Sequence, residues 1–260
     1  MYTVLAVSIG NTRIQLGRIE DGEVKESVYF EHAATSHVID KLGSWWNESG
    51  EESNRSVMLA SVHAERANEL RSLIIDQFGA EVYELEKDIP VPIGRDLEPE
   101  TIVGVDRLLD AAAAWEQLKQ ACVIIDAGSA VTVDFVDGEG VFHGGAILPG
   151  IMMQIRSMAE GANLLDEIEF RRPEGDAFGR STSEAMLRGV FHGIRGGVWR
   201  VIESYAEAYG AYPLVIATGG DAETLFKNDE EISRIIPDLA IRGIAVAAQH
   251  ATALDDEDNS

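Results

Sequence analysis

Four short polar segments of the chain carry residue types that can bind phosphate or accept a proton. In the first, an apolar run ends at Ser8, and the turn Gly10-Asn11-Thr12 follows before apolar and polar residues alternate. Glycine in such a turn lets the backbone approach an anion closely, and the threonine hydroxyl can donate a hydrogen bond. Taken alone, the segment favours a plain β-hairpin turn.

The second segment begins at Asp126, where another buried apolar run ends, and continues through Ser129 to Ala130. A carboxylate at a strand end can hold a cation, and the serine hydroxyl can bond a phosphate. The plainer alternative is an Asx-turn that only ends the strand.

These two segments belong to an internal repeat. The stretch "VLAVSIGNTRIQLGRIEDGEV" matches "CVIIDAGSAVTVDFVDGEGV" in having an apolar strand, a polar turn, an alternating strand and an acidic turn with glycine. The repeat aligns Ser8 with Asp126 and Gly10 with Gly128. It predicts two similar half-domains whose turns aim backbone N–H groups into one cleft, an arrangement suited to binding phosphate.

The third segment is Gly104-Val-Asp106-Arg107, at the start of a strongly patterned helix. Asp106 could cap that helix, or it could act as a general base beside a bound hydroxyl with Arg107 on an anion. The spacing alone favours the cap.

The fourth segment, "ATGGDA" at 217–222, has a Gly219-Gly220 turn between a strand and a helix. Such a turn leaves room for a flat ring or a ribose. It is also typical of an ordinary strand-to-helix connection.

Several better-known motifs are missing from the sequence. There is no P-loop and no G-x-G-x-x-G after a strand, and the six histidines lack the spacing of metal ligands. We interpret each histidine as a surface residue or a core residue with its hydrogen bonds satisfied, and no spacing suggests a nucleophile paired with a base.

The elements that must position these segments alternate between strands and helices, which is typical of an α/β protein. The first half predicts strands near 2–7, 12–19, 23–30, 57–62 and 81–86, helices near 35–46, 64–77 and 104–119, and a loop over 87–103. Asp21-Gly22 should join two of these strands. The second half predicts strands at 122–126, 131–137 and 140–148, a helix after Pro149-Gly150, a long helix capped by Ser181 and Glu184, a strand before Gly219, and a closing helix.

Composition limits the possible partners. The 260 residues carry a formal net charge of −24, which repels nucleic acid and anionic membranes, so an anionic ligand needs local help from Mg²⁺, backbone N–H groups or arginines. Cys122 is the only cysteine, and no membrane span or signal peptide is predicted, which indicates a cytoplasmic protein. The acidic end, 253–260, is expected to be solvated and disordered.

Together these segments resemble the type III pantothenate kinases, of the actin/hexokinase-like superfamily of duplicated ATPase domains. The resemblance covers nearly the whole chain and is carried, in order, by "SIGNTRIQLG", "ASVHAE", "GVDR", "DAGSAVTVD", "GVFHGGAILPG", "GRST" and "TGGDA". It implies two actin/ribonuclease-H-like half-domains, 1–118 and 119–252, each a mixed sheet flanked by helices, with a cleft between them.

The resemblance also implies a reaction: ATP phosphorylates the primary hydroxyl of pantothenate to 4′-phosphopantothenate, the first step of coenzyme A biosynthesis. Asp106 would be the proton acceptor, and Asp126 would bind a monovalent cation, K⁺ or NH₄⁺. Mg²⁺ would accompany ATP, and the family is typically homodimeric, with the pantothenate pocket near the subunit interface. The implied ATP-binding residues are Ser8, Gly10, Asn11, Thr12, Arg13, Ser129, Gly219 and Gly220, and the implied pantothenate-binding residues are Gly104, Val105, Arg107 and Thr182.

The chain departs from the family pattern at two places. The family has an aspartate where this chain has Ser8, and that aspartate is the natural partner of Mg²⁺ or its waters. The family usually has a tyrosine shortly before G-x-D-R, whereas "GRDLEPETIV" has none. Two alternatives to the kinase therefore stay open: an impaired or regulatory paralogue that binds nucleotide or a pantothenate-like ligand, and a kinase for another small hydroxyl substrate.

Overall fold

The structure is a computed structural model that describes residues 2–49, 55–161, 169–175 and 177–258. Its backbone contacts divide the chain into two compact units: unit 1 holds residues 1–117 and 238–260, and unit 2 holds residues 118–237. The sequence had assigned 119–252 to the second half. The closing helix instead belongs to unit 1, because it packs on the strands of that unit.

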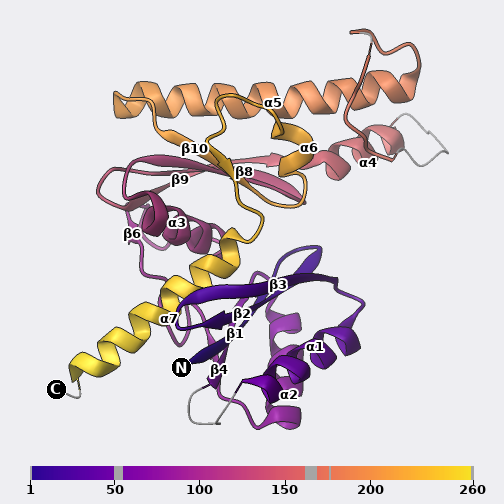
Figure 1. The fold of residues 1–260 in the computed structure, drawn as a ribbon. Coiled ribbons are helices and arrows are strands. Elements are labelled where there is room, and N and C mark those ends of the chain that lie inside the picture. Colours follow the sequence, from indigo (N-terminus) through magenta and orange to yellow (C-terminus); the bar gives the residue numbers. More distant parts are fainter. Residues whose placement is uncertain (1, 50–54, 162–168, 176, 259–260) are drawn as a thin grey trace. The chain divides into compact units, whose positions relative to one another are not determined.

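Unit 1 is built on a mixed sheet with the strand order β3-β2-β1-β4-β5 (Figure 1). The first three strands form an antiparallel meander, and β4 and β5 add to it in parallel. Its strands are β1 (Thr3–Ile9), β2 (Arg13–Glu20), β3 (Glu23–Glu31), β4 (Arg55–Ser61) and β5 (Val82–Glu84). Its helices are α1 (Thr35–Glu48), α2 (Ala64–Phe78), α3 (Val105–Leu118) and α7 (Leu239–Asp258), and the short strand β6 (Gly94–Arg95) falls in the segment expected to be a loop.

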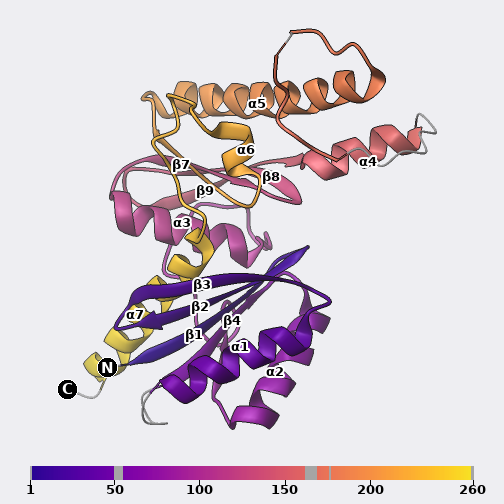
Figure 2. The same ribbon diagram turned by 45° about the vertical axis from the view of Figure 1, so that its right-hand side comes forward.

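The two faces of this sheet are covered by different helices (Figures 1 and 2). Leu5, Val7 and Leu16 point toward α1 and α2, where they join a buried cluster that contains Trp45. The alternate residues face α7, which approaches so closely that a Cβ at Gly17 would lie 2.3 Å from Cγ2 of Ile241. Both faces are therefore buried, which accounts for the continuous apolar run in β1.

Unit 2 repeats this plan. Its strands run in the order β11-β10-β7-β8-β9, with β7, β8 and β9 antiparallel and β10 parallel to β7 and β11. They are β7 (Cys122–Ala127), β8 (Ala130–Val136), β9 (Val141–Pro149), β10 (Leu214–Thr218) and the unpredicted β11 (Arg234–Ile235), and the helices are α4 (Ile151–Gly161), α5 (Thr182–Tyr209) and α6 (Ala222–Phe226). In each unit the first three strands form an antiparallel meander, and two later strands continue the sheet in parallel beside the first one. The predicted duplication is therefore confirmed.

The core of unit 2 lies between its sheet and the long helix α5 (Figure 2). Ile125 and Val133 of the sheet belong to the same buried cluster as Val190, Ile194 and Val198, which follow one another at helical spacing. This core fixes β7 and β8, the two strands that meet at the second polar turn.

Two local expectations have opposite outcomes. Asp21 and Gly22 both have positive φ, of 47° and 80°, as a two-residue type I′ hairpin turn requires, so that prediction is confirmed. The acidic end was expected to be disordered, but α7 continues to Asp258. Its sequence after Gly243 contains many alanines and no glycine or proline, so nothing in it ends the helix earlier.

Candidate active site

The first polar turn joins β1 to β2 at the edge of unit 1. Ile9 pairs with Ile14, and the N–H of Gly10 donates to the carbonyl of Arg13 at 3.0 Å. Gly10 does not have a positive φ, and a Cβ there would lie 3.5 Å from the Arg13 oxygen, an ordinary contact. The hairpin therefore does not need glycine at this place, and the remaining physical reason for one is close approach by a ligand.

Ser8 lies directly opposite Gln15 in the β1–β2 ladder, so both side chains project on one face of the sheet. Ser8 is half-buried, and Gln15 is 8% exposed. Within the described residues, Nε2 of Gln15 has no hydrogen-bond partner. A buried amide donor without an acceptor is costly, and an anionic oxygen at this strand end would satisfy it. These neutral donors suit a phosphate oxygen, whereas neither side chain supplies negative charge for a metal.

A residue that the sequence analysis passed over also contacts this turn. His32 follows β3, and its Nε2 lies 2.9 Å from the carbonyl oxygen of Gly10. Its ring packs edge-on against the ring of His63, with 5.7 Å between centroids. Both rings thus have partners, as expected of satisfied histidines, but no sequence pattern indicated that His32 would contact this turn.

The Asp106 segment reaches the same edge of unit 1. Helix α3 begins at Val105, so Asp106 is its second residue and not its N-cap. The N–H of Arg107 donates to Oδ1 of Asp106 at 2.9 Å and to the carbonyl of Gly104 at 3.1 Å. The aspartate thus steadies the first turn of the helix from inside it and presents a half-buried carboxylate.

Gly104 explains how that carboxylate fits. A Cβ at Gly104 would lie 2.5 Å from Oδ1 of Asp106 and 3.6 Å from Cγ1 of Val62. The N–H of Val62 in turn donates to the carbonyl of Ile9 at 3.2 Å, immediately before the first turn. The structure therefore places Gly104, at the start of the Asp106 segment, against Val62, whose backbone bonds the residue before the first turn.

The second polar turn joins β7 to β8 in unit 2, with Asp126 half-buried and Ser129 exposed. The N–H of Gly128 donates across it to the carbonyl of Ala130 at 2.9 Å. On one side of the turn, Gly150 donates to the carbonyl of Ser129 at 3.2 Å, and a Cβ there would meet the Gly128 oxygen at 2.3 Å. Backbone packs directly on backbone at this place.

The β10–α6 turn closes the other side. Gly219 has φ +92°, and a Cβ there would lie 2.3 Å from both Oδ1 of Asp126 and the carbonyl oxygen of Ala127. The N–H of Asp221 donates to that same carbonyl at 2.9 Å. The structure thus brings together Asp126 and the Gly219-Gly220 turn, two segments that the sequence had nominated separately.

Thr182 is the exposed first residue of α5. The predicted helix start is confirmed, because Oγ of Ser181 accepts from the N–H of Glu184 at 3.2 Å. Glu184 does not complete the capping box on Ser181; its Oε2 accepts from the N–H of Arg180 at 3.0 Å. The role of Thr182 toward a substrate stays a prediction.

The described part of the chain contains no cluster of three or more His, Cys, Asp or Glu side chains arranged to hold a metal ion. A divalent ion at these turns would be carried by phosphate oxygens and water, with one carboxylate at most from each turn, which is how proteins commonly bind Mg²⁺ with ATP. Burial raises the pKa of the Cys122 thiol to about 12, so this single cysteine is neutral and not a nucleophile. Within the described ranges, no helix is both long and apolar enough to span a membrane.

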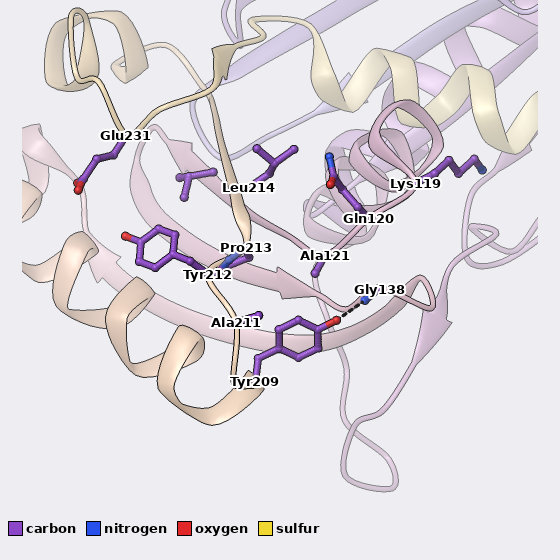
Figure 3. Close-up of a pocket in the computed structure, with 11 residues that line it drawn as sticks. Lys119, Gln120, Ala121, Gly138, Tyr209, Ala211, Tyr212, Pro213, Leu214 and Glu231 are labelled. Carbon is purple, nitrogen blue, oxygen red and sulfur yellow. Dashed lines mark hydrogen bonds between the residues drawn. The ribbon is translucent and has the colours of Figure 1, made fainter.

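A separate open hollow of about 710 Å³ lies elsewhere in unit 2 (Figure 3). It is lined by Ala121 and Leu214, at the beginnings of β7 and β10, whereas Asp126 and Gly219 follow the ends of those strands. The hydroxyl of Tyr209 accepts from the N–H of Gly138 at 3.2 Å within it. This hollow is therefore not the predicted site.

Comparisons with known proteins identify the family. The model of the family described as type III pantothenate kinase matches residues 4–204. A type III pantothenate kinase from Rhodospirillum rubrum is 30% identical over 250 residues, covering 94% of this chain and 96% of its own. One from Legionella pneumophila strain Paris is 29% identical over 259 residues, covering 96% of this chain and all of its own.

Two solved structures show the same fold at low identity. Component A of (R)-2-hydroxyglutaryl-CoA dehydratase from Acidaminococcus fermentans aligns with a TM-score of 0.55 at 12% identity, covering 96% and 97% of the two chains. MreB 5 of Spiroplasma citri aligns with a TM-score of 0.51 at 11% identity, covering 99% of each. The architecture is thus the actin/hexokinase-like fold. Within that class, the chain belongs to the type III pantothenate kinase family.

Proposed function

We propose that this chain transfers a phosphoryl group from ATP to the primary hydroxyl of pantothenate, giving 4′-phosphopantothenate and ADP in the first step of coenzyme A biosynthesis. Membership of the family supports the reaction. The observation that carries it is the half-buried carboxylate of Asp106, in a segment whose Gly104 lies against Val62, the residue that bonds Ile9 just before the first polar turn.

Phosphoryl transfer depends on alignment and charge neutralisation more than on covalent help from the protein. In our proposal, Asp106 orients the pantothenate hydroxyl and takes its proton as the new bond to phosphorus forms. The N–H of Arg107 already holds one oxygen of this carboxylate, which fixes the direction of the group. Gly104, Val105, Arg107 and Thr182 are the proposed contacts to pantothenate.

The two polar turns would hold the nucleotide. The buried amide of Gln15, which has no partner among the described residues, and the absence of crowding at Gly10 support phosphate binding at the first turn, to which we assign Ser8, Gly10, Asn11, Thr12 and Arg13. Asp126 would hold K⁺ or NH₄⁺ and Ser129 would bond ATP at the second turn, with Gly219 and Gly220 leaving room for the nucleoside. Mg²⁺ bound to ATP would neutralise phosphate charge in a protein whose own net charge is −24.

A second copy of the chain is the proposed partner. Ile147 of β9 is 63% exposed, and Met152 and Met153 at the start of α4 are 39% and 53% exposed. Exposed apolar side chains close in sequence are typical of a subunit interface and costly in a monomer. We therefore propose a cytoplasmic homodimer, to be tested by sedimentation of the wild type against an M153E variant, which should shift toward monomer.

The deciding assay follows ADP and 4′-phosphopantothenate together. Purified protein with MgATP, K⁺ and pantothenate should release both products in equal amounts, measured by a coupled ADP assay and by mass spectrometry. Ser8 is the observation that favours the rival, a relative that binds these ligands without efficient turnover. Binding of ATP and pantothenate with no product across a wide range of metal concentrations would support that rival and contradict the kinase.

A further inference from the structure

We propose that His32 is a positioning residue for the first polar turn: its hydrogen bond to the Gly10 carbonyl aims the N–H of Asn11 at a phosphate oxygen of the nucleotide. The inference rests on the proposed function, because it takes ATP as the ligand of this turn. It adds a residue that no motif had indicated.

The argument begins with the bond itself. A carbonyl oxygen only accepts, so Nε2 of His32 must carry the hydrogen in the 2.9 Å contact to Gly10. A peptide unit is planar and trans, so its C=O and the N–H that follows point in opposite directions. Holding the Gly10 oxygen toward His32 therefore directs the Asn11 N–H to the opposite side of the turn.

The backbone N–H of Gly10 is not available to a ligand. Its own N–H donates to the Arg13 carbonyl at 3.0 Å to close the hairpin. The Asn11 N–H is thus the next main-chain donor along the exposed part of the turn, where Asn11 itself is exposed. A backbone N–H of fixed direction is a strong element of a phosphate site, because it needs no reorganisation when the anion arrives.

His32 is itself held firmly enough to act in this way. Arg66 of α2 donates through Nη2 to the main-chain carbonyl of His32 and, at 2.6 Å, to Oγ1 of Thr35. Its Nη1 pairs with Glu69. The edge-on ring of His63 covers one side of the imidazole. Backbone and ring of His32 are therefore both restrained, so the bond can constrain Gly10.

The role is geometric and does not depend on the charge of the ring. Nε2 carries a hydrogen in the charged ring and in one neutral tautomer, and the Gly10 carbonyl favours that tautomer. A glutamine amide can place a donor at nearly the same distance from the backbone as Nε2, whereas an asparagine amide is one methylene shorter. Comparing glutamine with asparagine at position 32 therefore tests whether the donor must lie at the distance of Nε2, because both variants carry an amide.

The experiment compares H32A, H32Q and H32N with the wild type, and uses H37A as a control because His37 is an exposed histidine of α1. The measurements are kcat, KM for ATP, KM for pantothenate, and the Kd of a non-hydrolysable ATP analogue by calorimetry. H32A and H32N should raise KM for ATP and the analogue Kd by about five- to tenfold, as expected for one lost hydrogen bond. KM for pantothenate should stay within about twofold, H32Q should recover most of the affinity, and H37A should match the wild type.

Two outcomes would overturn the inference. One is an unchanged analogue Kd in H32A and H32N. The other is an equal loss for ATP and pantothenate that H32Q does not rescue, which would indicate a general structural role. If H32A does not fold, the comparison of H32Q with H32N still decides. The calorimetric arm needs no turnover, so a wild type that binds the analogue but makes no product would contradict the proposed function and leave this test valid.

Discussion

The two polar turns occupy equivalent places in a duplicated fold, yet they are held by different means. The second turn is fixed by backbone packing, with Gly150 on one side and Gly219 on the other, each too close to the turn for a Cβ. The first has no such packing at Gly10, where a Cβ would make only an ordinary contact, and it is braced from outside by the side chain of His32. The second turn is thus held by contacts between backbone segments, whereas the first is held by a side chain that a single substitution can remove.

The difference extends to the residues that begin the turns. Asp126 lies against Gly219 and pairs in register with Thr132 and Thr218, whereas Ser8 lies opposite Gln15. The strand before the second turn therefore ends in a carboxylate, which we propose binds a cation, and the strand before the first ends beside neutral donors, which we propose bind an anion. Duplicated turns therefore need not keep the same residue chemistry.

The largest effect should come from the proposed base. D106N should lower kcat by about 10³-fold, because a general base of this kind contributes roughly 10²- to 10⁴-fold. Stability should change by less than about 1 kcal/mol, since an asparagine Oδ1 can still accept from the N–H of Arg107. Steady-state kinetics and urea unfolding measure the two quantities. Retained turnover would reduce Asp106 to a residue that steadies the start of α3.

Substitutions of Gly219 and Gly10 test whether the two turns are held by different means. G219A should lower the free energy of unfolding by about 3 kcal/mol or more, because its φ is +92° and the new Cβ would lie 2.3 Å from two oxygens. G10A, at the equivalent open turn, should cost less than about 1 kcal/mol and should instead weaken ATP binding. Urea unfolding of the pair provides the measurement. Similar losses of stability in both variants would show that the two turns are held alike.

The Ser8 position tests whether the first turn can regain the charge of the second. S8D should raise kcat/KM for MgATP by about tenfold and lower the Mg²⁺ concentration needed for half-maximal rate, since a carboxylate is the preferred partner of Mg²⁺ and its waters. The buried amide of Gln15, opposite Ser8, can donate to the new carboxylate. S8N is the matched control, similar in size and uncharged. An equal gain in S8N, or none in S8D, would mean that charge is not what this turn lacks.

Sequence patterns predicted most of the fold because they act locally. Alternating residues, the Asp21-Gly22 turn and the Ser181 cap all depend on neighbours in the chain, and each is present in the structure. The association of α7 with unit 1 was not predictable in this way, because it depends on a contact between Gly17 and Ile241, which lie far apart in the sequence. The His32 contact was missed for the same reason: it joins residues that lie 22 positions apart and follows no spacing rule.

The smallest predicted effect concerns the strand that carries the second turn. Cys122 is completely buried in β7, and this burial raises the pKa of its thiol from 9.0 to about 12. The folded state therefore keeps a proton that the unfolded chain loses near pH 9. The contribution of the buried thiol to the free energy of unfolding is therefore complete below pH 9. It falls as pH rises toward 12, by about 1.4 kcal/mol per pH unit at most. Urea unfolding at pH 8 and pH 10 should show this loss in the wild type and a smaller one in C122A. Equal slopes in the two proteins would assign the loss at high pH to other groups.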